Sequence, residues 1–174
     1  MQTDRFTLRP WRDSDAETLY KYASDPDVGP RAGWPPHKSV EESLFIIRTI
    51  FSGDRMWAIE LQATGKPIGC IGYLLSGESN ISIGSNDCEA GYWIAKPYWN
   101  QGICTEALRL VIDHCFNEKH FDAIWGDFFL DNPASGRVME KCGFRDTGEI
   151  SYCSQLAVGS DRPVHTMKLN KINQ

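Results

Sequence analysis

The order of strand-like and helix-like segments is the feature that most constrains the fold of this chain. Runs in which apolar and polar residues alternate predict strands, and runs with apolar residues three or four positions apart predict helices. We expect strands at 6–10, 56–61, 68–75, 89–95, 123–130, 144–152 and 163–169, and helices at 14–25, 39–53, 105–118 and 132–143. This order predicts an α/β (α+β) fold, a mixed sheet with helices on both faces.

Two of the expected helices start with a capping-box pattern, in which a Glu follows a Ser by three residues. Ser14 and Glu17 form the first pattern, and Pro26 stops the helix that follows it. Ser39 and Glu42 form the second. We therefore expect both serines to cap their helices.

Length and charge limit the class of protein. A chain of 174 residues suits one domain, so we expect a single domain over residues 1–174. The formal net charge of −5 opposes binding to a nucleic-acid backbone, which needs clustered Lys and Arg. No apolar run has the roughly 18 residues that span a bilayer, and the first residues lack the pattern of a secretory signal. We expect a cytoplasmic protein without nucleic-acid or membrane partners.

The six cysteines and four histidines are dispersed along the chain. The cysteines form no Cys-x-x-Cys pair, and the histidines share no metal-ligand spacing with them. We therefore expect reduced thiols and no bound metal.

The segment Trp99–Thr105 joins an expected strand to an expected helix through Gly102. The first N–H groups of a helix lack partners within the helix and point the same way, so they can bind an anion. Gly102 lets a ligand approach the backbone closely. An ordinary strand-to-helix turn is the alternative interpretation of this single glycine. The segment lacks the G-x-G-x-x-G and G-x-x-x-x-G-K-[ST] patterns, which argues against NAD and ATP.

Several segments together resemble one enzyme family. Tyr98–Leu108 resembles the acetyl-CoA loop of the GCN5-related N-acetyltransferases (GNAT). Asp131–Ser135 and Val138–Phe144 are similar to the Asn-x-x-Ser helix of this family and the Lys-x-Gly-Phe segment that ends it. Arg5–Pro10 and Glu89–Ile94 resemble the RimJ/RimL-like branch, which acetylates the N-termini of ribosomal proteins. The resemblance spans nearly the whole chain and implies a largely antiparallel GNAT-like sheet with a splayed central strand pair.

The loop departs from the family pattern at two positions. The family loop often reads Arg/Gln-x-x-Gly-x-Gly/Ala, whereas this chain has Trp99 first and Cys104 last. Cys is nearly as small as Ala, so the helix can still approach the phosphates of the cofactor. Because Trp99 does not provide the usual first contact, we expect phosphate binding to rest on backbone amides. These are the amides of Gln101, Gly102, Ile103, Cys104 and Thr105.

The resemblance also implies how the cofactor arm and the leaving thiolate are handled. Backbone groups of Trp93, Ile94 and Ala95 are expected to contact the pantetheine arm and the acetyl group, and one of their N–H groups would stabilise the oxyanion. Asn132 is expected to bind the cofactor. Ser135, one helical turn later, would hydrogen-bond or protonate the departing sulfur, although a surface serine is the alternative.

The general base and the acceptor site are less constrained by the sequence. Glu89 is the first candidate base because it opens the central strand, and a solvated carboxylate at the strand end is the alternative. Glu149 and Tyr152 are weaker candidates. The resemblance places Trp34 and His37 at the acceptor amine, together with Trp11, although aromatic residues in loops also serve as packing anchors.

These observations imply transfer of an acetyl group from acetyl-CoA to a primary amine by direct attack on the thioester. The favoured acceptor is the N-terminal amine of a protein or peptide. A small amine such as a polyamine, aminoglycoside or amino acid is the first alternative, and a non-catalytic acetyl-CoA-binding module is the second. Exposed edge strands near the C-terminal end would allow a homodimer.

Overall fold

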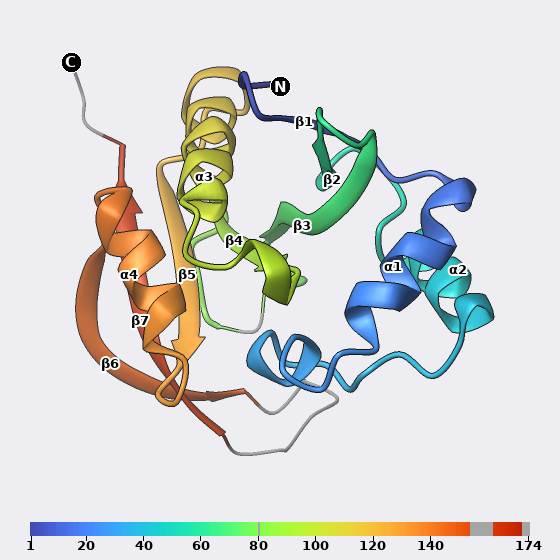
Figure 1. Cartoon of the computed structure of the whole chain (residues 1–174). Coiled ribbons are helices and arrows are strands. Elements are labelled where there is room, and N and C mark those ends of the chain that lie inside the picture. The colour runs from blue at the N-terminus through green and yellow to red at the C-terminus, as the bar shows by residue number, and fades with distance from the viewer. Residues whose placement is uncertain (80, 154–161, 172–174) are drawn as a thin grey trace. The chain divides into compact units, whose positions relative to one another are not determined.

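The computed structural model describes residues 1–79, 81–153 and 162–171, and its elements follow the expected order (Figure 1). The strands are β1 (Phe6–Pro10), β2 (Met56–Leu61), β3 (Lys66–Leu75), β4 (Asp87–Ile94), β5 (Ala123–Phe129), β6 (Arg145–Cys153) and β7 (Arg162–Asn170). The α-helices are α1 (Ala16–Ala23), α2 (Val40–Thr49), α3 (Ile103–Asp113) and α4 (Pro133–Lys141). Short 3-10 turns lie at Asp13–Asp15, Gly29–Arg31 and Lys96–Tyr98.

The strands form a mixed sheet in the order β1-β2-β3-β4-β5-β7-β6. The pairs β1–β2, β2–β3, β5–β7 and β6–β7 are antiparallel, whereas β4 and β5 are parallel. The ladder between β4 and β5 joins Asp87–Glu89 to Ala123–Trp125, although β4 continues to Ile94 and β5 to Phe129. The expected sheet, largely antiparallel with a splayed central pair, is therefore confirmed.

The chain forms two compact units that interleave in sequence. The first consists of Met1–Gly72 and Tyr92–Ala107, and the second of Tyr73–Gly91 and Leu108–Gln174. The boundary between them runs through β3, β4 and α3. The expectation of one domain over residues 1–174 stays a prediction.

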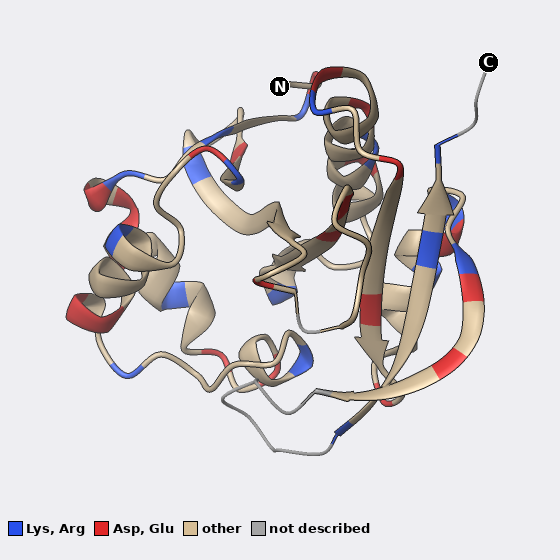
Figure 2. Cartoon of the chain, turned by 180° about the vertical axis from the view of Figure 1, so that it is seen from behind, with Lys and Arg blue, Asp and Glu red and all other residues tan. Residues whose placement is uncertain are grey.

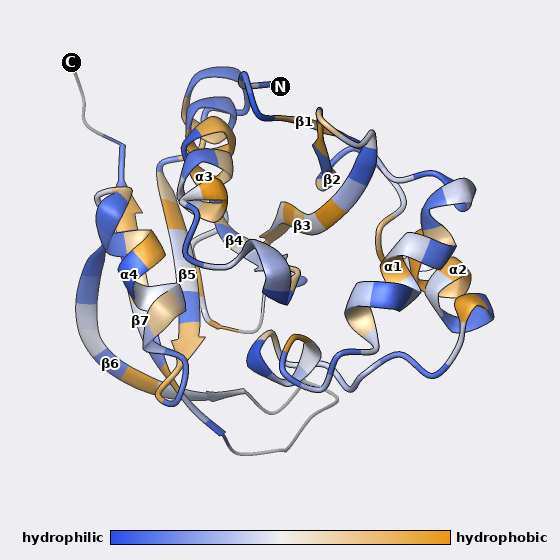
Figure 3. Ribbon diagram, in the orientation of Figure 1, coloured by the Kyte–Doolittle hydropathy of each residue, from blue (hydrophilic) through white to orange (hydrophobic). Residues whose placement is uncertain are grey.

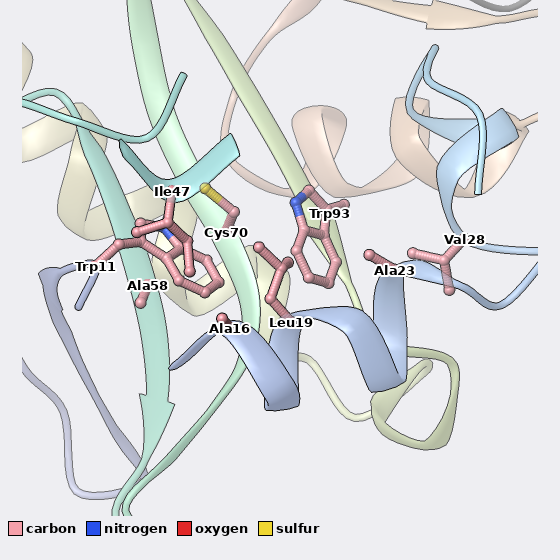
Figure 4. Close-up of a cluster of buried hydrophobic side chains, with 9 residues drawn as sticks. All are labelled: Trp11, Ala16, Leu19, Ala23, Val28, Ile47, Ala58, Cys70 and Trp93. Atoms are coloured by element: carbon pink, nitrogen blue, oxygen red, sulfur yellow. The ribbon is translucent and has the colours of Figure 1, made fainter. Parts of the chain in front are cut away.

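The core of the first unit lies where α1 and α2 meet the sheet (Figure 4). Its buried side chains are Trp11, Ala16, Leu19, Ala23, Val28, Ile47, Ala58, Cys70 and Trp93. Leu19 comes from α1 and Ile47 from α2, while Ala58, Cys70 and Trp93 come from β2, β3 and β4. Burial raises the pKa of the Cys70 thiol to about 12, so this cysteine remains protonated at neutral pH.

Of the two expected serine caps, the one at α2 is confirmed. The Oγ of Ser39 accepts the N–H of Glu42 at 3.2 Å, and α2 starts at the next residue after the serine. Val40, Leu44 and Ile47 of this segment pack on the core. Local sequence is sufficient here because the cap and its partner lie within one helical turn.

The expected Ser14 cap is wrong, because a buried ion network takes over the start of α1. The N-cap residue is Asp15, and no side chain caps the helix. Its carboxylate accepts the Arg12 N–H at 2.9 Å and binds the Arg9 guanidinium at 2.7 and 2.9 Å. Arg9 Nε also donates to Glu60 at 2.5 Å. Burial opposes the charge on Arg9, but the hydrogen bonds of both carboxylates outweigh it and raise the pKa of the guanidinium.

In the second unit, α4 packs closely on β5. A Cβ at Gly136 of α4 would lie 2.7 Å from the ring of Phe128, and one at Gly126 of β5 would lie 2.6 Å from the sulfur of Met139. A side chain at Gly136 would have to displace the Phe128 ring, and one at Gly126 would have to displace the end of the Met139 side chain. The two glycines therefore allow α4 to lie close to β5.

Helix α3 differs from the expectation at both ends. It begins at Ile103, two residues before the expected start, and its α-helical part ends at Asp113. A π-helical turn follows at His114–Glu118, with Lys119 N–H bound to His114 O at 3.1 Å. The Lys171 ammonium donates to Phe116 O at 2.7 Å. This partner lies far away in sequence, so the spacing of apolar residues in the helix does not predict the π-helical turn.

Figure 3 shows hydrophobic residues along β3, β5 and α3, and Figure 2 shows charged residues of both signs interspersed along the chain. Among the described residues, no helix is long and apolar enough to cross a membrane. Across the same part of the chain, no group of three or more His, Cys, Asp or Glu side chains is placed to hold a metal ion.

The substitution Arg9→Met removes the buried cation and leaves the carboxylates of Asp15 and Glu60 without their partner. We expect the free energy of unfolding, measured by urea denaturation, to fall by about 3–5 kcal/mol. Arg48→Met is the matched control because it removes an exposed ion pair with Asp13, and it should leave stability nearly unchanged. Equal effects of the two substitutions would contradict a special role for the buried network.

Candidate active site

The loop between β4 and α3 contains two residues in the left-handed backbone region. Asn100 has a φ of 60° and Gly102 a φ of 77°. Gly102 O accepts the N–H of Glu106 at 3.1 Å, so α3 starts directly after the glycine. A residue with a Cβ is strained at this φ, and a β-branched one most of all. Gly102 therefore lies at the strand-to-helix turn where the sequence predicts it.

The start of α3 has the properties of an anion-binding site. The first N–H groups of a helix carry the positive end of its dipole. The side chains of Ile103 and Thr105 are buried, so recognition at this point falls to the backbone. A Cβ at Gly102 would meet only Arg5 Nη2 within 4 Å, at 3.9 Å. The expectation that the amides of this loop bind the phosphates of coenzyme A agrees with this geometry and stays a prediction.

Trp99, which departs from the family pattern, holds the loop to the end of β4. Its indole Nε1 donates to Ile94 O at 2.7 Å, and its ring packs against the core of the first unit. The guanidinium of Arg31 lies 5.5 Å from the centre of the ring. The first position of the loop thus fixes the shape of the turn instead of offering a polar side chain to a ligand.

The end of β4 has fewer backbone groups available than the sequence suggests. Ala95 N–H donates to Ile68 O at 2.8 Å, and Ala95 O accepts the N–H of Tyr98 at 2.9 Å. The Ala95 amide is therefore not an oxyanion donor in this conformation, which restricts the expected donor to Trp93 or Ile94. The Trp93 side chain belongs to the core, at 8% exposed, so only its backbone can serve an extended ligand.

The two residues expected at the acceptor site lie together in the first unit. The Trp34 and His37 rings have centroids 5.1 Å apart, and Trp34 also meets the Trp93 ring edge-on at 5.8 Å. His37 Nδ1 and the buried Ser43 Oγ are 2.8 Å apart. Burial lowers the pKa of His37, so its imidazole is neutral near pH 7. Trp11 instead stacks on Phe51 at 5.0 Å as a core residue.

Glu89 is buried, so the interpretation of it as a solvated strand-end carboxylate is wrong. It is 4% exposed, and the Ser79 hydroxyl donates to its Oε2 at 2.6 Å. Ile81 N–H in turn donates to Ser79 Oγ at 3.2 Å. The weaker candidates Glu149 and Tyr152 are exposed on β6. Of the three candidates, Glu89 is the buried one, and the hydrogen bond from Ser79 fixes the position of its carboxylate. Its role as the general base stays a prediction.

Asn132 and Ser135 lie at the N-terminal end of α4 in the second unit. Asn132 N–H donates to Phe129 O at 2.7 Å, and Ser135 N–H donates to Asn132 O at 3.1 Å. Both side chains are half-buried and one helical turn apart, as expected. The expectation that they face the same cofactor as the Gly102 loop joins the two units and stays a prediction.

Sequence reasoning did not assign three side chains that contact the candidate residues. Ser43 contacts His37, Ser79 contacts Glu89, and Arg5 contacts the loop. No local pattern identifies the two serines, because their partners lie in other elements of the fold. Arg5 stands in the opening segment that resembles the RimJ/RimL-like branch, and this is the one signal that could have directed attention to it.

Comparisons with known proteins give a consistent result. The family described as "Acetyltransferase (GNAT) domain" matches residues 5–145. The uncharacterized N-acetyltransferase YoaA of Bacillus subtilis is 28% identical over 173 residues, covering 96% of this chain and 95% of YoaA.

Solved structures share the fold at low identity. A GNAT-family acetyltransferase from Bacillus anthracis has a TM-score of 0.80 at 20% identity, covering 98% of this chain and 97% of its own. A Vibrio cholerae spermidine N-acetyltransferase in complex with CoA and spermine has a TM-score of 0.74 at 17% identity, covering 97% and 96%. The ribosomal-protein-S5-alanine acetyltransferase of Vibrio fischeri has a TM-score of 0.73 at 19% identity, covering 98% and 95%.

The substitution Gly102→Val tests the assignment of the phosphate loop. Valine disfavours the left-handed backbone of this turn, so we expect coenzyme A to bind about tenfold more weakly or worse in calorimetric titration. Gly65→Val is the matched control, since Gly65 has a φ of 64° in the β2–β3 turn and a Cβ there meets no atom within 4 Å. Unchanged affinity in a folded Gly102→Val protein would remove the loop from the cofactor site.

Proposed function

Because the chain belongs to the GNAT acetyltransferase family, we propose that this acetyl-CoA-dependent enzyme acetylates the N-terminal amine of a protein or peptide. The reaction class and the cofactor follow from membership of the family. The acceptor does not, since the fold is shared by proteins named for a ribosomal protein and for spermidine. The charges of the expected acceptor segment are the observation that favours a peptide over a small polycation.

The segment between α1 and α2, residues 25–38, carries two acidic and two basic residues. Asp27 forms an ion pair with Lys96, which lowers the pKa of the Asp27 carboxyl through a hydrogen bond. The Asp25 carboxylate accepts the N–H of Asp27 at 2.9 Å. A polyamine or an aminoglycoside carries several positive charges and needs carboxylates to bind them. Because Arg31 and Lys38 balance the two carboxylates within this segment, it offers no excess of negative charge, which supports an acceptor with a single charge.

The surroundings of that segment also suit a peptide end. Trp34 and His37 present aromatic rings, and the His37 imidazole is neutral near pH 7. Neutral rings pack well against the side chain of a first residue without repelling its ammonium group. A peptide N-terminal amine has a pKa near 8, whereas an alkyl amine such as that of lysine has one near 10.4. The N-terminal amine therefore loses its proton more readily before it attacks the thioester.

The candidate residues would divide the remaining work. Acetyl-CoA supplies the acetyl group as a thioester that an amine can attack. The amides of residues 101–105 would hold its phosphates, and backbone groups of Trp93 and Ile94 would orient its arm. Glu89 would accept the proton of the amine through water, while Ser79 holds the carboxylate by the hydrogen bond at 2.6 Å. Asn132 would bind the cofactor arm.

A homodimer belongs to the same proposal. Strand β6 ends the sheet order, and it exposes Ile150 and Tyr152, at 53% and 62%. An edge strand of this kind has backbone groups that a second copy can pair with.

A panel of amines with acetyl-CoA, read by release of free thiol, tests the acceptor. We expect peptides with a free N-terminal Ser or Ala to give a kcat/KM about tenfold or more above that of spermidine, an aminoglycoside or free amino acids. A peptide with a blocked N-terminus and an internal Lys is the control and should release little thiol. Preference for spermidine would contradict the proposal, as would the absence of thiol release with every amine.

Ser135→Ala tests the role of the hydroxyl at the departing sulfur. Loss of a proton donor to the thiolate should lower kcat by about ten- to hundredfold while the dissociation constant of coenzyme A changes less. Ser14→Ala, an exposed serine in the first unit, is the control. A kcat equal to that of the unmodified enzyme would remove Ser135 from the mechanism.

A further inference from the structure

Arg5 bridges the phosphate loop and the first turn of α3. Its Nη1 donates to Gln101 O at 2.9 Å, its Nε donates to Glu106 Oε2 at 3.0 Å, and its Nη2 forms an ion pair with the same carboxylate. The backbone of Arg5 is held as well, since Arg5 O accepts the N–H of Gln62 at 2.9 Å. A residue 96 positions before the loop in sequence is thus fixed against it by the pairing of β1 with β2.

The hydrogen bond to Gln101 O constrains the direction of the next amide. In a planar trans peptide the C=O of one residue and the N–H of the following residue point in opposite directions. With the Gln101 carbonyl held toward the guanidinium, the Gly102 N–H points away from Arg5. This amide is one of those expected to bind a phosphate.

Glu106 presents an electrostatic problem for an anion at this place. It is the acidic residue in the first turn of α3, where a carboxylate is attracted by the same helix dipole that would attract a phosphate. Two anions at one helix end repel each other. The Arg5 guanidinium compensates the Glu106 carboxylate through two contacts.

We propose that Arg5 is a positioning residue for the cofactor: it orients the Gly102 amide and neutralises Glu106, so that the loop accepts phosphate. This rests on the proposed function of the loop. Both side chains are partly exposed, at 44% and 33%, and exposed ion pairs contribute little to folding stability. We therefore expect the loss of Arg5 to lower cofactor affinity more than folding stability. The role requires the planar guanidinium of an arginine, because the ammonium group of a lysine cannot hold the Gln101 carbonyl and the Glu106 carboxylate in the same geometry.

The experiment compares two acetyl donors with Arg5→Gln. Acetyl-CoA carries the phosphates, whereas S-acetyl-N-acetylcysteamine has the same thioester without them. We expect about a tenfold weaker binding of coenzyme A by calorimetry and a matching rise in KM for acetyl-CoA, with kcat retained. The kcat/KM for the short thioester should stay unchanged. Adding Glu106→Gln to Arg5→Gln should recover part of the affinity, and Arg5→Lys should fall between Arg5→Gln and the unmodified enzyme.

Two controls separate this proposal from its alternatives. Arg48→Gln makes the same change in net charge at the exposed pair with Asp13 and should bind coenzyme A normally. If Arg5→Gln lowers kcat/KM equally for acetyl-CoA and for the short thioester, the contact of Arg5 is merely structural and the proposal is overturned. If Gly102→Val binds coenzyme A weakly while Arg5→Gln binds it normally, the loop assignment stands and the proposed role of Arg5 is overturned. Normal binding in Gly102→Val would overturn the loop assignment itself.

Discussion

The buried guanidinium of Arg9 is the interaction on which the arrangement of the first unit depends. A charge removed from water needs partners at every donor, and Arg9 finds them in Asp15, Glu60 and the carbonyl of Pro10. These partners lie before α1, in β2 and in β1 itself, so one side chain joins three parts of the fold. With β1 held in this way, Arg5, the residue that precedes it, has a defined place beside the candidate phosphate loop.

The candidate cofactor loop works through its backbone, and its side chains mainly maintain its shape. Trp99 anchors the turn to Ile94 O, Gln101 donates its side-chain amide to Pro97 O, and Ile103 is buried. This explains how the chain departs from the usual family residues without losing the turn. What an anion requires is a set of directed N–H groups, and several side-chain combinations can direct them.

The sequence was sufficient where the determinants are local. The Ser39 cap and the position of Gly102 depend on residues a few positions apart, and the structure has them as predicted. Prediction failed where contacts between different elements decide. Ser14 does not cap α1 because Arg9 of β1 binds Asp15, and the solvated alternative for Glu89 is wrong because the fold buries this residue, where Ser79 donates to it.

The interleaving of the two units has a consequence for the way in which the chain acquires its structure. The core of the first unit contains Trp93, which follows a stretch of the second unit in sequence. A fragment that stops at Gly72 lacks that tryptophan and leaves the apolar faces of α1 and α2 without their β4 partner. Neither unit is a continuous stretch of chain, so a growing polypeptide cannot complete one and then begin the other. Their maturation during synthesis is coupled through β3, β4 and α3.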